Sequence, residues 1–272
     1  MSTLDKFRLD EKVAIVTGAA GLLGSEFSQA LSSAGASVIA ADIEQGGAER
    51  VAEDLREHGL EVESALLDVR DPESVASLME GIRDRFGKID ILVNSAAIDP
   101  KFEPDRAKEQ SNSFETYPLE AWRAALEVNL TGMFLITQAV AGLMSETARG
   151  SIINICSTYG LAGPDQRIYQ QPGEPARYKP VYYSTTKAGV LGFTRYLAAY
   201  YHGTEIRVNA LTPGGVYNEH DDAFVKAYSS RTILGRMAQK DEMNGALLFL
   251  ASDASSYMTG ANLVVDGGWT AW

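Results

Sequence analysis

The chain has little of what secreted, nucleic-acid-binding or membrane proteins require. A single cysteine, Cys156, stands among 272 residues, so no disulfide can form within the chain and a reducing compartment is expected. Acidic residues outnumber basic ones, and the net charge of −12 disfavours a nucleic-acid partner. No uncharged apolar run reaches the roughly 18 residues of a membrane span, and the opening MSTLDKFRLDEK lacks the apolar core of a signal peptide. We therefore expect a cytoplasmic protein without a membrane segment.

The chain does contain a regular alternation of short apolar runs with longer helical patterns. Seven runs predict buried strands, at residues 13–17, 37–42, 61–68, 89–94, 151–155, 205–211 and 262–266. Helices are predicted at residues 22–34, 46–58, from Pro72 onward, 119–147 and 183–201. Because most strands are apolar on both faces, they predict a doubly wound parallel sheet with helices on both sides. No repeat or linker is visible, so one α/β domain is expected over residues 1–272.

Three segments interrupt this alternation. Residues 99–118 are polar and charged, residues 158–182 carry four prolines, and residues 214–238 form a short lid region before the last strand. Each follows a predicted strand, at the carboxyl edge where open α/β sheets bind ligands. Long connections in a compact domain are usually functional or mobile. We interpret the three segments as substrate loops; tolerated surface insertions are the alternative.

The octapeptide TGAAGLLG (Thr17–Gly24) lies between the first predicted strand and the first predicted helix. Its glycines stand three residues apart, unlike the common dinucleotide pattern G-x-G-x-x-G. Gly18 can adopt the dihedral angles of a turn, Gly21 allows close approach of a ligand, and Gly24 allows the helix to pack near the sheet. The amides at the helix start favour an anionic pyrophosphate. A tight turn without a ligand is the alternative. The residues predicted to contact a dinucleotide here are Gly18, Gly21, Leu22, Leu23 and Gly24.

Asp42 ends the second predicted strand, about 20 residues after the glycines. A carboxylate at this place can accept hydrogen bonds from the adenosine ribose hydroxyls, and it would repel a 2′-phosphate. The next residues, Ile43, Glu44 and Gln45, supply no cation to reverse this preference. NAD is therefore predicted over NADP; an exposed acid at a strand end is the alternative.

The pentapeptide YSTTK places the Tyr183 phenol and the Lys187 ammonium four residues apart, on one face of a helix. A nearby cation lowers the pKa of a phenol toward the range useful for proton transfer. Ser157 follows the fifth predicted strand, where its hydroxyl could polarise the substrate oxygen that Tyr183 protonates. Asn129, in the long helix, could hold a water behind Lys187. Each feature has a simpler alternative when taken singly. Tyr183 and Lys187 could be paired by chance, Ser157 could be an ordinary turn residue, and Asn129 could be an ordinary residue of the helix interior.

Together, these residues resemble the short-chain dehydrogenase/reductase family, in its shorter single-domain branch. The motifs occur in family order over nearly the whole chain: TGAAGLLG, Asp42, LLDV with Asp68, VNSAA, EVNL, INICS, YSTTK, LTPGGV and VVDGG. No single motif is decisive, but this many in order are highly specific. The resemblance implies a Rossmann-like sheet of seven parallel strands and an NAD(P)-dependent oxidoreductase that acts on CH–OH groups.

The resemblance also implies residue roles. Tyr183 would be the acid/base, Ser157 would orient the substrate, and Lys187 would tune Tyr183 and bind the nicotinamide ribose. Asn129 would support a proton relay. The other implied cofactor contacts are Asp68 and Val69 beside the adenine, Asn94, Ser95, Ala96 and Ala97 behind the cofactor, and Pro213 and Val216 toward the carboxamide. No metal is implied, and the three histidines, His58, His202 and His220, form no ligand cluster.

Some features depart from the family pattern. Leu22 stands where this branch usually has glycine, and T-G-x-x-G-x-x-G is the spacing of the extended branch, which acts on sugar nucleotides. The extended branch needs a sizeable C-terminal substrate domain, whereas only a short region follows Pro213 here. The family motif N-N-A-G is replaced here by NSAA, at residues 94–97. The separation of Ser157 and Tyr183 is about twice the usual one, so an unusual substrate pocket is expected if residues 158–182 cover the site.

The long loop before Tyr183 predicts a hydrogen-bonding wall with cations rather than an apolar one. Its polar residues are Asp165, Gln166, Arg167, Tyr169, Gln170, Gln171, Arg177 and Lys179. This set favours a polyhydroxylated or anionic substrate, and STYGLAGPDQRIY…KPVYYSTTKAG also resembles oxidoreductases of flagellin-glycan and nonulosonic-acid pathways. We predict an NAD-dependent dehydrogenase that exchanges hydride with a secondary alcohol or ketone of a carbohydrate-like substrate. The alternatives are a 3-oxoacyl-(acyl-carrier-protein) reductase and a non-catalytic NAD-binding sensor or scaffold.

The C-terminal segment NLVVDGGWTAW is similar to segments that pack between subunits in this family, often in tetramers. Trp269 and Trp272 would be unusual side chains to leave in water. We therefore predict a homo-oligomer, a tetramer or a dimer, with a small-molecule substrate and no nucleic-acid or membrane partner. A buried last strand with a loose tail is the alternative.

Overall fold

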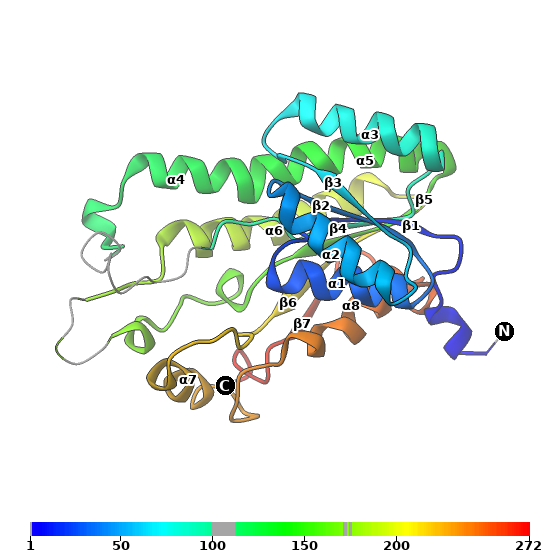
Figure 1. Ribbon diagram of the computed structural model, residues 1–272. Coiled ribbons are helices and arrows are strands. Elements are labelled where there is room, and N and C mark those ends of the chain that lie inside the picture. The colour runs from blue at the N-terminus through cyan, green and yellow to red at the C-terminus, as the bar shows by residue number, and fades with distance from the viewer. Residues whose placement is uncertain (1, 100–111, 171–172, 174–175) are drawn as a thin grey trace.

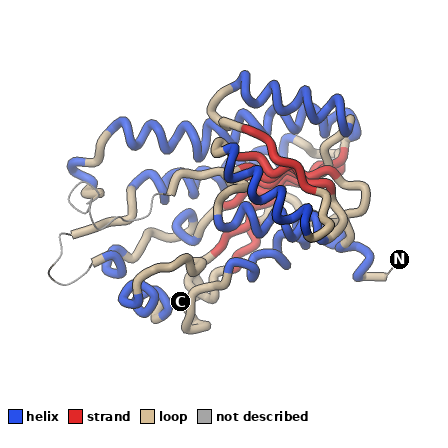
Figure 2. Tube along the Cα trace, viewed as in Figure 1, coloured by secondary structure: helices blue, strands red, loops and turns tan. Residues whose placement is uncertain are grey.

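The computed structural model describes residues 2–99, 112–170, 173 and 176–272, which fold around a seven-stranded sheet (Figures 1 and 2). All strand pairs are parallel, in the order β3-β2-β1-β4-β5-β6-β7. The strands are β1 (Val13–Thr17), β2 (Ser37–Asp42), β3 (Val62–Leu66), β4 (Ile91–Asn94), β5 (Arg149–Ile155), β6 (Glu205–Pro213) and β7 (Asn262–Val265). The predicted doubly wound, seven-stranded parallel fold is confirmed.

The strand order reverses between β1 and β4. From β1 the chain proceeds outward to β2 and β3, and it then returns to place β4 on the other side of β1. The connections leaving β1 and β4 therefore run in opposite directions across the sheet. Such a reversal opens a crevice at the carboxyl ends of the two strands, where Thr17 and Asn94 lie in register.

The inner strands are buried on both faces, which explains their continuous apolar runs. All five residues of β1 are buried, and Ile15 lies in register between Ile39 and Leu92. The edge strands β3 and β7 are partly exposed. Parallel strands covered on both faces have no polar side to alternate with, as the sequence pattern indicates.

Two helical layers cover the sheet (Figure 1). One layer contains α1, α2 and α8, and the other contains α3, α5 and α6. The helices are α1 (Leu22–Ser33), α2 (Gln45–Glu57), α3 (Pro72–Phe86), α4 (Leu119–Leu126), α5 (Met133–Thr147), α6 (Val181–Tyr200), α7 (Asp222–Ser229) and α8 (Asn244–Ala251). The short 3-10 helices are Leu4–Phe7, Phe114–Thr116, Thr158–Gly160, Gln166–Tyr169, Lys240–Met243 and Asp253–Ser255.

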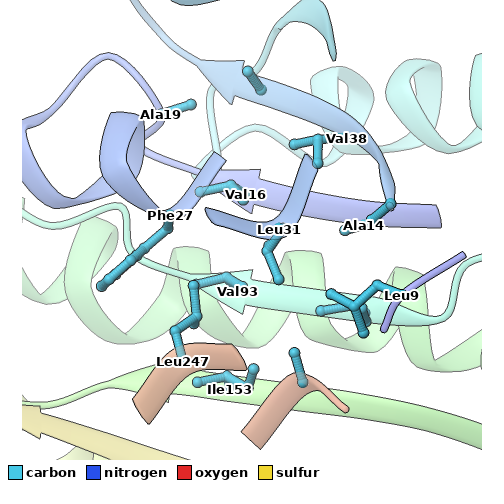
Figure 3. Packing of buried hydrophobic residues seen from close by; sticks show 14 of the residues in the cluster. Leu9, Ala14, Val16, Ala19, Phe27, Leu31, Val38, Val93, Ile153 and Leu247 are labelled. Atoms are coloured by element: carbon cyan, nitrogen blue, oxygen red, sulfur yellow. The ribbon is translucent and has the colours of Figure 1, made fainter. Parts of the chain in front are cut away.

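The core between α1, α8 and the sheet holds the first helix against the strands (Figure 3). Phe27 and Leu31 of α1 and Leu247 of α8 are fully buried, together with Val16 and Val93 of the sheet. Burying an apolar side chain of this size stabilises a protein by roughly 1.5–3 kcal/mol. The start of α1, where the glycine motif lies, is therefore attached to a rigid platform.

Several helix predictions need correction. The predicted helix 119–147 is continuous, but residues Glu127–Gly132 form a π-helical turn, a feature often found at functional sites. Helix α6 begins at Val181 rather than at Tyr183, and β3 is shorter than predicted. Helices α7 and α8 were not predicted. The sequence of α8, NGALLFLA, is apolar around most of its circumference, so it shows no helical period.

The helix from Leu119 to Thr147 is long and apolar enough to cross a membrane by length and composition alone. Half of its most apolar window is buried within the protein. Ile136, Val140 and Met144 belong to the core beneath α3 and α6. Burial against the sheet accounts for the apolar composition of this helix.

Candidate active site

A cavity of about 740 Å³ lies at the carboxyl ends of the strands. Its size is within the usual range for sites that bind cofactors and small ligands. The glycine turn after β1 lines one end, and the side chains around Tyr183 line the other. All the residues predicted as catalytic or cofactor-binding line this cavity except Asn94 and Asn129.

The glycine turn is shaped by close backbone contacts. Gly18 has a φ of +68°, and a Cβ atom there would lie 2.7 Å from the Cα of Ala96. A Cβ on Gly24 would lie 2.1 Å from the Gly18 carbonyl oxygen, whereas one on Gly21 would lie 3.2 Å from it. Side chains are therefore excluded at Gly18 and Gly24, and Gly21 is less confined. Leu22 begins α1 in helical conformation, so the backbone needs no glycine there.

The start of α1 can receive an anion. Gly21 is the N-cap residue, and no side chain caps the helix. The first amides of a helix have no partner within it, and they carry the positive end of its dipole. Leu22, Leu23 and Gly24, which supply these amides, line the cavity. The turn thus has the form of a phosphate cradle.

Asp42 braces the glycine turn from the end of β2. Its Oδ2 accepts a hydrogen bond from the Ala20 amide at 2.9 Å, and its Oδ1 accepts one from the Glu44 amide at 3.0 Å. A carboxylate has about four acceptor positions, so Asp42 can still accept hydrogen bonds from ribose hydroxyls. Asp42 lines the cavity, as predicted.

Arg70 is a cavity-lining cation that the sequence interpretation did not include. Its Nε and Nη2 donate to the two oxygens of Asp68, at 2.9 and 2.6 Å. This bidentate pair, led by the side-chain hydrogen bond, lowers the pKa of Asp68. The guanidinium is therefore already paired with a carboxylate beside the predicted adenine position. Val69 is buried next to the pair.

Asn94 faces away from the cavity. Its Nδ2 donates to Thr137 Oγ1 and to Asn154 Oδ1, both at 2.8 Å, within the buried layer beneath α5. The amides of Ser95 and Ala96 instead donate to Thr17 Oγ1, at 3.1 and 3.2 Å. Asn94 thus fixes the end of β4, while Ser95, Ala96 and Ala97 form the cavity wall.

Asn129 lies in the π-helical turn and is buried. Its Oδ1 accepts from the Ile98 amide at 2.7 Å, and its Nδ2 lies 3.3 Å from the Ile98 carbonyl oxygen. The same Nδ2 donates to Thr186 Oγ1 at 3.2 Å. The amide therefore ties the segment after β4 to α6, one residue before Lys187. The relay role of Asn129 stays a prediction.

The structure brings Ser157, Tyr183 and Lys187 together. Ser157 follows β5, and its Oγ accepts from the Tyr159 amide at 3.2 Å; it lines the cavity together with Tyr183 of α6. The Lys187 Nζ donates to the Ile155 carbonyl oxygen at 2.9 Å and lies 5.8 Å from the centre of the Tyr183 ring. Lys187 is buried and lines the cavity one helical turn after Tyr183.

The pKa of Tyr183 moves opposite to the sequence expectation. Burial raises it well above its ordinary value, the Asp99 carboxylate raises it further, and the hydrogen bond to Ser157 lowers it. Burial also lowers the pKa of Lys187. The predicted lowering by the Lys187 cation is outweighed because desolvation disfavours the charged form of both groups. The phenol is therefore protonated at neutral pH.

The lid (residues 214–238) begins at the carboxyl end of β6 and closes on itself. The amide of Ala238 donates to the Gly215 carbonyl oxygen, and the amide of Tyr217 donates to the Ala238 carbonyl oxygen, each at 2.9 Å. The Tyr228 hydroxyl of α7 accepts from the Gly215 amide at 2.5 Å. These bonds hold Pro213 and Val216 at the cavity wall.

An aromatic wall lines the end of the cavity beyond Tyr183. Tyr159, Tyr169, His220, Phe224 and Tyr228 all line it. The Tyr169 hydroxyl donates to the Tyr159 hydroxyl at 2.9 Å, and Phe224 stacks on His220 with ring centres 4.9 Å apart. Sequence reasoning missed this wall, apart from Tyr169, because its members come from separate segments. The nearest signal was the tyrosine two residues after Ser157.

The predicted polar wall is therefore wrong in most of its members. Of the loop residues in the described part of that set, only Tyr169 and Lys179 line the cavity. Asp165 instead forms ion pairs with Arg167 and Arg231, at 2.8 and 2.5 Å. The Gln166 Oε1 accepts from the Lys179 amide at 2.9 Å. These groups pair with one another in the loop and with Arg231 of the lid, and Gln171 lies outside the described residues.

Trp269 has aromatic partners within the chain. It stacks on Tyr228 with ring centres 4.2 Å apart and meets the Tyr159 ring edge-on at 6.3 Å. Its partner surface is thus supplied by this chain, behind the aromatic wall. Trp272 is 77% exposed, although its Nε1 donates to the Arg231 carbonyl oxygen at 2.9 Å.

Two further groups complete the site. Lys179 and Asp99 form an ion pair, Nζ to Oδ1 at 2.5 Å, and both line the cavity. The Lys179 Nζ lies 4.0 Å from the centre of the Tyr183 ring. Within the described part of the chain, no group of three or more His, Cys, Asp and Glu side chains is placed to hold a metal ion.

Comparison with known proteins gives consistent matches over nearly the full length. Residues 18–270 match the family model described as Enoyl-(Acyl carrier protein) reductase. D-threitol dehydrogenase of Mycolicibacterium smegmatis is 37% identical, over 97% of this chain and 95% of that protein. The 3-oxoacyl-[acyl-carrier-protein] reductase FabG of Thermotoga maritima is 34% identical, over 96% and 98%.

A solved structure agrees with these matches. The gluconate 5-dehydrogenase from Burkholderia cenocepacia J2315, in complex with NADP and tartrate, has a TM-score of 0.85 and 33% identity, with both chains covered completely. The fold, the motif order and the full-length matches all point the same way. This chain therefore belongs to the short-chain dehydrogenase/reductase family, and it is an oxidoreductase that uses a nicotinamide cofactor on alcohol or ketone groups.

Proposed function

We propose that this enzyme is an NAD-dependent dehydrogenase that exchanges hydride with a secondary alcohol or ketone of a carbohydrate-like substrate. The observation that carries the proposal is that Ser157, Tyr183 and Lys187 line one end of a cavity whose other end is the glycine turn. The threitol and gluconate dehydrogenases among the relatives support a hydroxylated carbon chain as the substrate.

The cavity fits a dinucleotide along its length. The amides of Leu22, Leu23 and Gly24 would hold the pyrophosphate, and Asp42 would accept hydrogen bonds from the adenosine ribose. Lys187 would donate to the nicotinamide ribose. The bound nicotinamide supplies the hydride acceptor or donor. Gly18 and Gly24 keep the turn narrow, because a Cβ at either position would meet backbone.

Proton transfer falls to Tyr183. In the direction of ketone reduction, its phenol donates a proton to the substrate oxygen, and the Ser157 hydroxyl donates a hydrogen bond to the same oxygen. Burial keeps the pKa of Tyr183 high, so the donating form is present at neutral pH. In the direction of alcohol oxidation, the phenolate accepts the hydroxyl proton, and the Lys187 ammonium stabilises that phenolate. Alkaline conditions therefore favour oxidation.

The choice of NAD rests on Asp42 and on the pairing of Arg70 with Asp68. A 2′-phosphate would lie beside the Asp42 carboxylate, and the Arg70 guanidinium is already bound by Asp68. Titration of the enzyme with NADH and with NADPH, followed by nicotinamide fluorescence, tests this proposal. We expect tighter binding of NADH. A clear preference for NADPH would contradict the role of Asp42.

The catalytic proposal is tested with a Tyr183→Phe variant and a matched control, Tyr182→Phe. Loss of the acid/base should reduce turnover by about 10²–10⁴-fold. Tyr182 is buried, and its hydroxyl has no hydrogen-bond partner in the described structure, so the control should keep near-normal turnover. The assay is NADH production from polyols, aldoses, amino sugars and sugar phosphates. Unchanged turnover in Tyr183→Phe would favour a non-catalytic sensor or scaffold.

A second candidate keeps the same chemistry but uses an acyl-thioester ketone. The 34% identical FabG relative supports it. The net charge of −12 makes an acidic carrier protein a poorer partner. Consumption of NADH or NADPH with an acetoacetyl thioester, set against the carbohydrate panel, distinguishes the two substrates. Preference for the thioester would replace the carbohydrate proposal.

We also propose that the enzyme is a homo-oligomer. Phe134 of α5 is 46% exposed, and Tyr196 and Tyr200 of α6 are 65% and 63% exposed and stack on each other. Exposed aromatic side chains on neighbouring helices are typical of a surface that binds another subunit. Light scattering in solution should give the mass of a dimer or tetramer. A monomeric mass would refute the proposal.

A further inference from the structure

The ion pair between Lys179 and Asp99 is the most specific feature of the cavity that the hydride chemistry does not use. The two residues come from different loops, one before α6 and one after β4. Lys179 Nζ lies 2.5 Å from Asp99 Oδ1 and 4.0 Å from the centre of the Tyr183 ring. Both side chains line the cavity, so the pair lies beside the reacting end of any substrate held by Tyr183.

The backbone around Lys179 is held in place. The Lys179 amide donates to Gln166 Oε1 at 2.9 Å, and the Tyr178 carbonyl oxygen accepts from Asn112 Nδ2 at 3.1 Å. The next residue, Pro180, is the N-cap of α6 and is buried. These contacts fix the backbone that carries the Lys179 side chain at the start of α6.

The side chains of the pair differ in exposure. The Lys179 side chain is only 13% exposed, whereas that of Asp99 is 41% exposed. A mostly buried ammonium needs a counter-charge, and Asp99 supplies it. The pair as a whole carries no net charge. It nevertheless offers both N–H donors on Lys179 and free acceptor positions on the Asp99 carboxylate.

A substrate hydroxyl can use both halves of such a pair, because it donates one hydrogen bond and accepts others. A substrate carboxylate can only accept, and beside Lys179 it would also lie beside the negative charge of Asp99. The substrate carboxylate would lose its hydration, and its attraction to Lys179 would be offset by its repulsion from Asp99. The aromatic faces of Tyr159 and Phe224 can cover the C–H groups of the same substrate.

We propose that Lys179 and Asp99 form a hydroxyl-recognition pair that selects neutral polyols and their ketones over hydroxy acids. This inference rests on the proposed carbohydrate-like substrate and adds the charge of that substrate. In the bound state, a hydroxyl near the reacting carbon donates to Asp99 and accepts from Lys179. The pair thus orients the carbon whose oxygen meets Tyr183 and Ser157.

The test compares matched alditols and aldonates of four to six carbons, assayed by NADH formation as kcat/KM. The variants are Asp99→Asn, Lys179→Met and, as the control for loss of a loop cation, Arg167→Met. Arg167 is paired with Asp165 and does not line the cavity. NADH binding by each variant reports that the folded cofactor site is intact.

The wild-type enzyme should favour alditols by about tenfold or more, the usual effect of an unpaired buried charge or polar group. Asp99→Asn leaves a lone cation and should raise the aldonate-to-alditol ratio by about tenfold. Lys179→Met should lower alditol kcat/KM mainly through KM, without improving aldonates. Arg167→Met should leave the ratio unchanged.

Two outcomes overturn the inference in distinguishable ways. The recognition pair alone is overturned if the wild-type enzyme prefers aldonates. It is also overturned if Asp99→Asn binds NADH normally but changes the aldonate-to-alditol ratio of kcat/KM by less than about twofold. In that case turnover of the panel still supports the proposed function. Turnover of neither class by the wild-type enzyme overturns the carbohydrate proposal and the pair together.

Discussion

Replacing Gly24 with alanine should destabilise the protein, although alanine is the better helix former. In an open helix the change would stabilise by about 1 kcal/mol. Here the new Cβ would lie 2.1 Å from the Gly18 carbonyl oxygen and 2.8 Å from the Ala19 Cα. These are backbone atoms, and they cannot rotate away as a flexible side chain would.

The turn is also braced on its far side, which limits how far it can move. The Ala20 amide donates to Asp42 Oδ2 at 2.9 Å, and the Ala19 amide donates to the Ala41 carbonyl oxygen at 3.2 Å. Phe27, one turn further along α1, is fully buried. Overpacking against a fixed backbone costs about 3 kcal/mol, so the net loss after the helix-propensity gain is about 2 kcal/mol. That loss corresponds to a fall in Tm of roughly 4–8 °C.

Thermal unfolding followed by circular dichroism measures the change, with Gly21→Ala as the matched control. A Cβ on Gly21 would lie 3.2 Å from the Gly18 carbonyl oxygen, a contact that a small shift relieves. We expect its Tm to fall by no more than about 3 °C, while its NADH affinity falls because the methyl group enters the cradle. A Gly24→Ala protein with the wild-type Tm or higher would refute the steric argument. Unchanged NADH affinity in Gly21→Ala would refute the close approach at that residue.

Three further predictions follow from the charges in and around the cavity. Asp42→Asn should reduce the preference for NADH over NADPH in fluorescence titrations, because the repulsion of the 2′-phosphate is removed. An unchanged preference would contradict the proposal that Asp42 selects the cofactor. Asp99 helps to raise the pKa of Tyr183, so Asp99→Asn should move the rising limb of the oxidation rate to lower pH, and a shift to higher pH would contradict this. Hydrogen bonding to Arg236 lowers the pKa of Glu242 to about 2 from an ordinary 4.5. Its stabilising effect is therefore present above pH 4.5 and lost toward pH 2. Because the Arg236–Glu242 pair is partly exposed, Glu242→Gln should lower the free energy of unfolding by less than about 1 kcal/mol at pH 7. Denaturant unfolding of the wild type and the variant at pH 7 and near pH 2 measures this loss; a loss as large in acid as at pH 7 would contradict the prediction.

Local signals in the sequence were sufficient for many elements. The run VAIVT predicts the first strand, because each residue of a fully buried strand is apolar irrespective of its partners. Pro72 predicts the start of α3, and the structure adds Asp71 as its N-cap, whose side chain accepts from the Glu73 amide at 3.0 Å. Such signals act between residues a few positions apart, so tertiary contacts are not needed to read them.

Other elements gave no usable local signal. Helix α8 is apolar around most of its surface because it packs both on the sheet and against its neighbour α1, so its sequence has no clear polar face. Helix α7 is short and lies within the lid, although Asp221 is its N-cap and accepts from the Phe224 amide. Trp269 was expected not to be left in water, and it stacks within the chain on Tyr228, which the sequence did not indicate. Each outcome depends on which distant segment covers the residue.

The sequence by itself determined the parallel fold, the family, the glycine turn with Asp42, and the grouping of Ser157, Tyr183 and Lys187 near one sheet edge. These conclusions follow from strand–turn–helix order, because the carboxyl ends of parallel strands meet at one edge. Only the tertiary structure decided which side chains face the cavity. It joined Lys179 to Asp99 across 80 residues and raised the pKa of Tyr183 where a lowering was predicted. The physical reason is that burial and charge pairing depend on every segment packed around a group, and sequence spacing does not specify those segments.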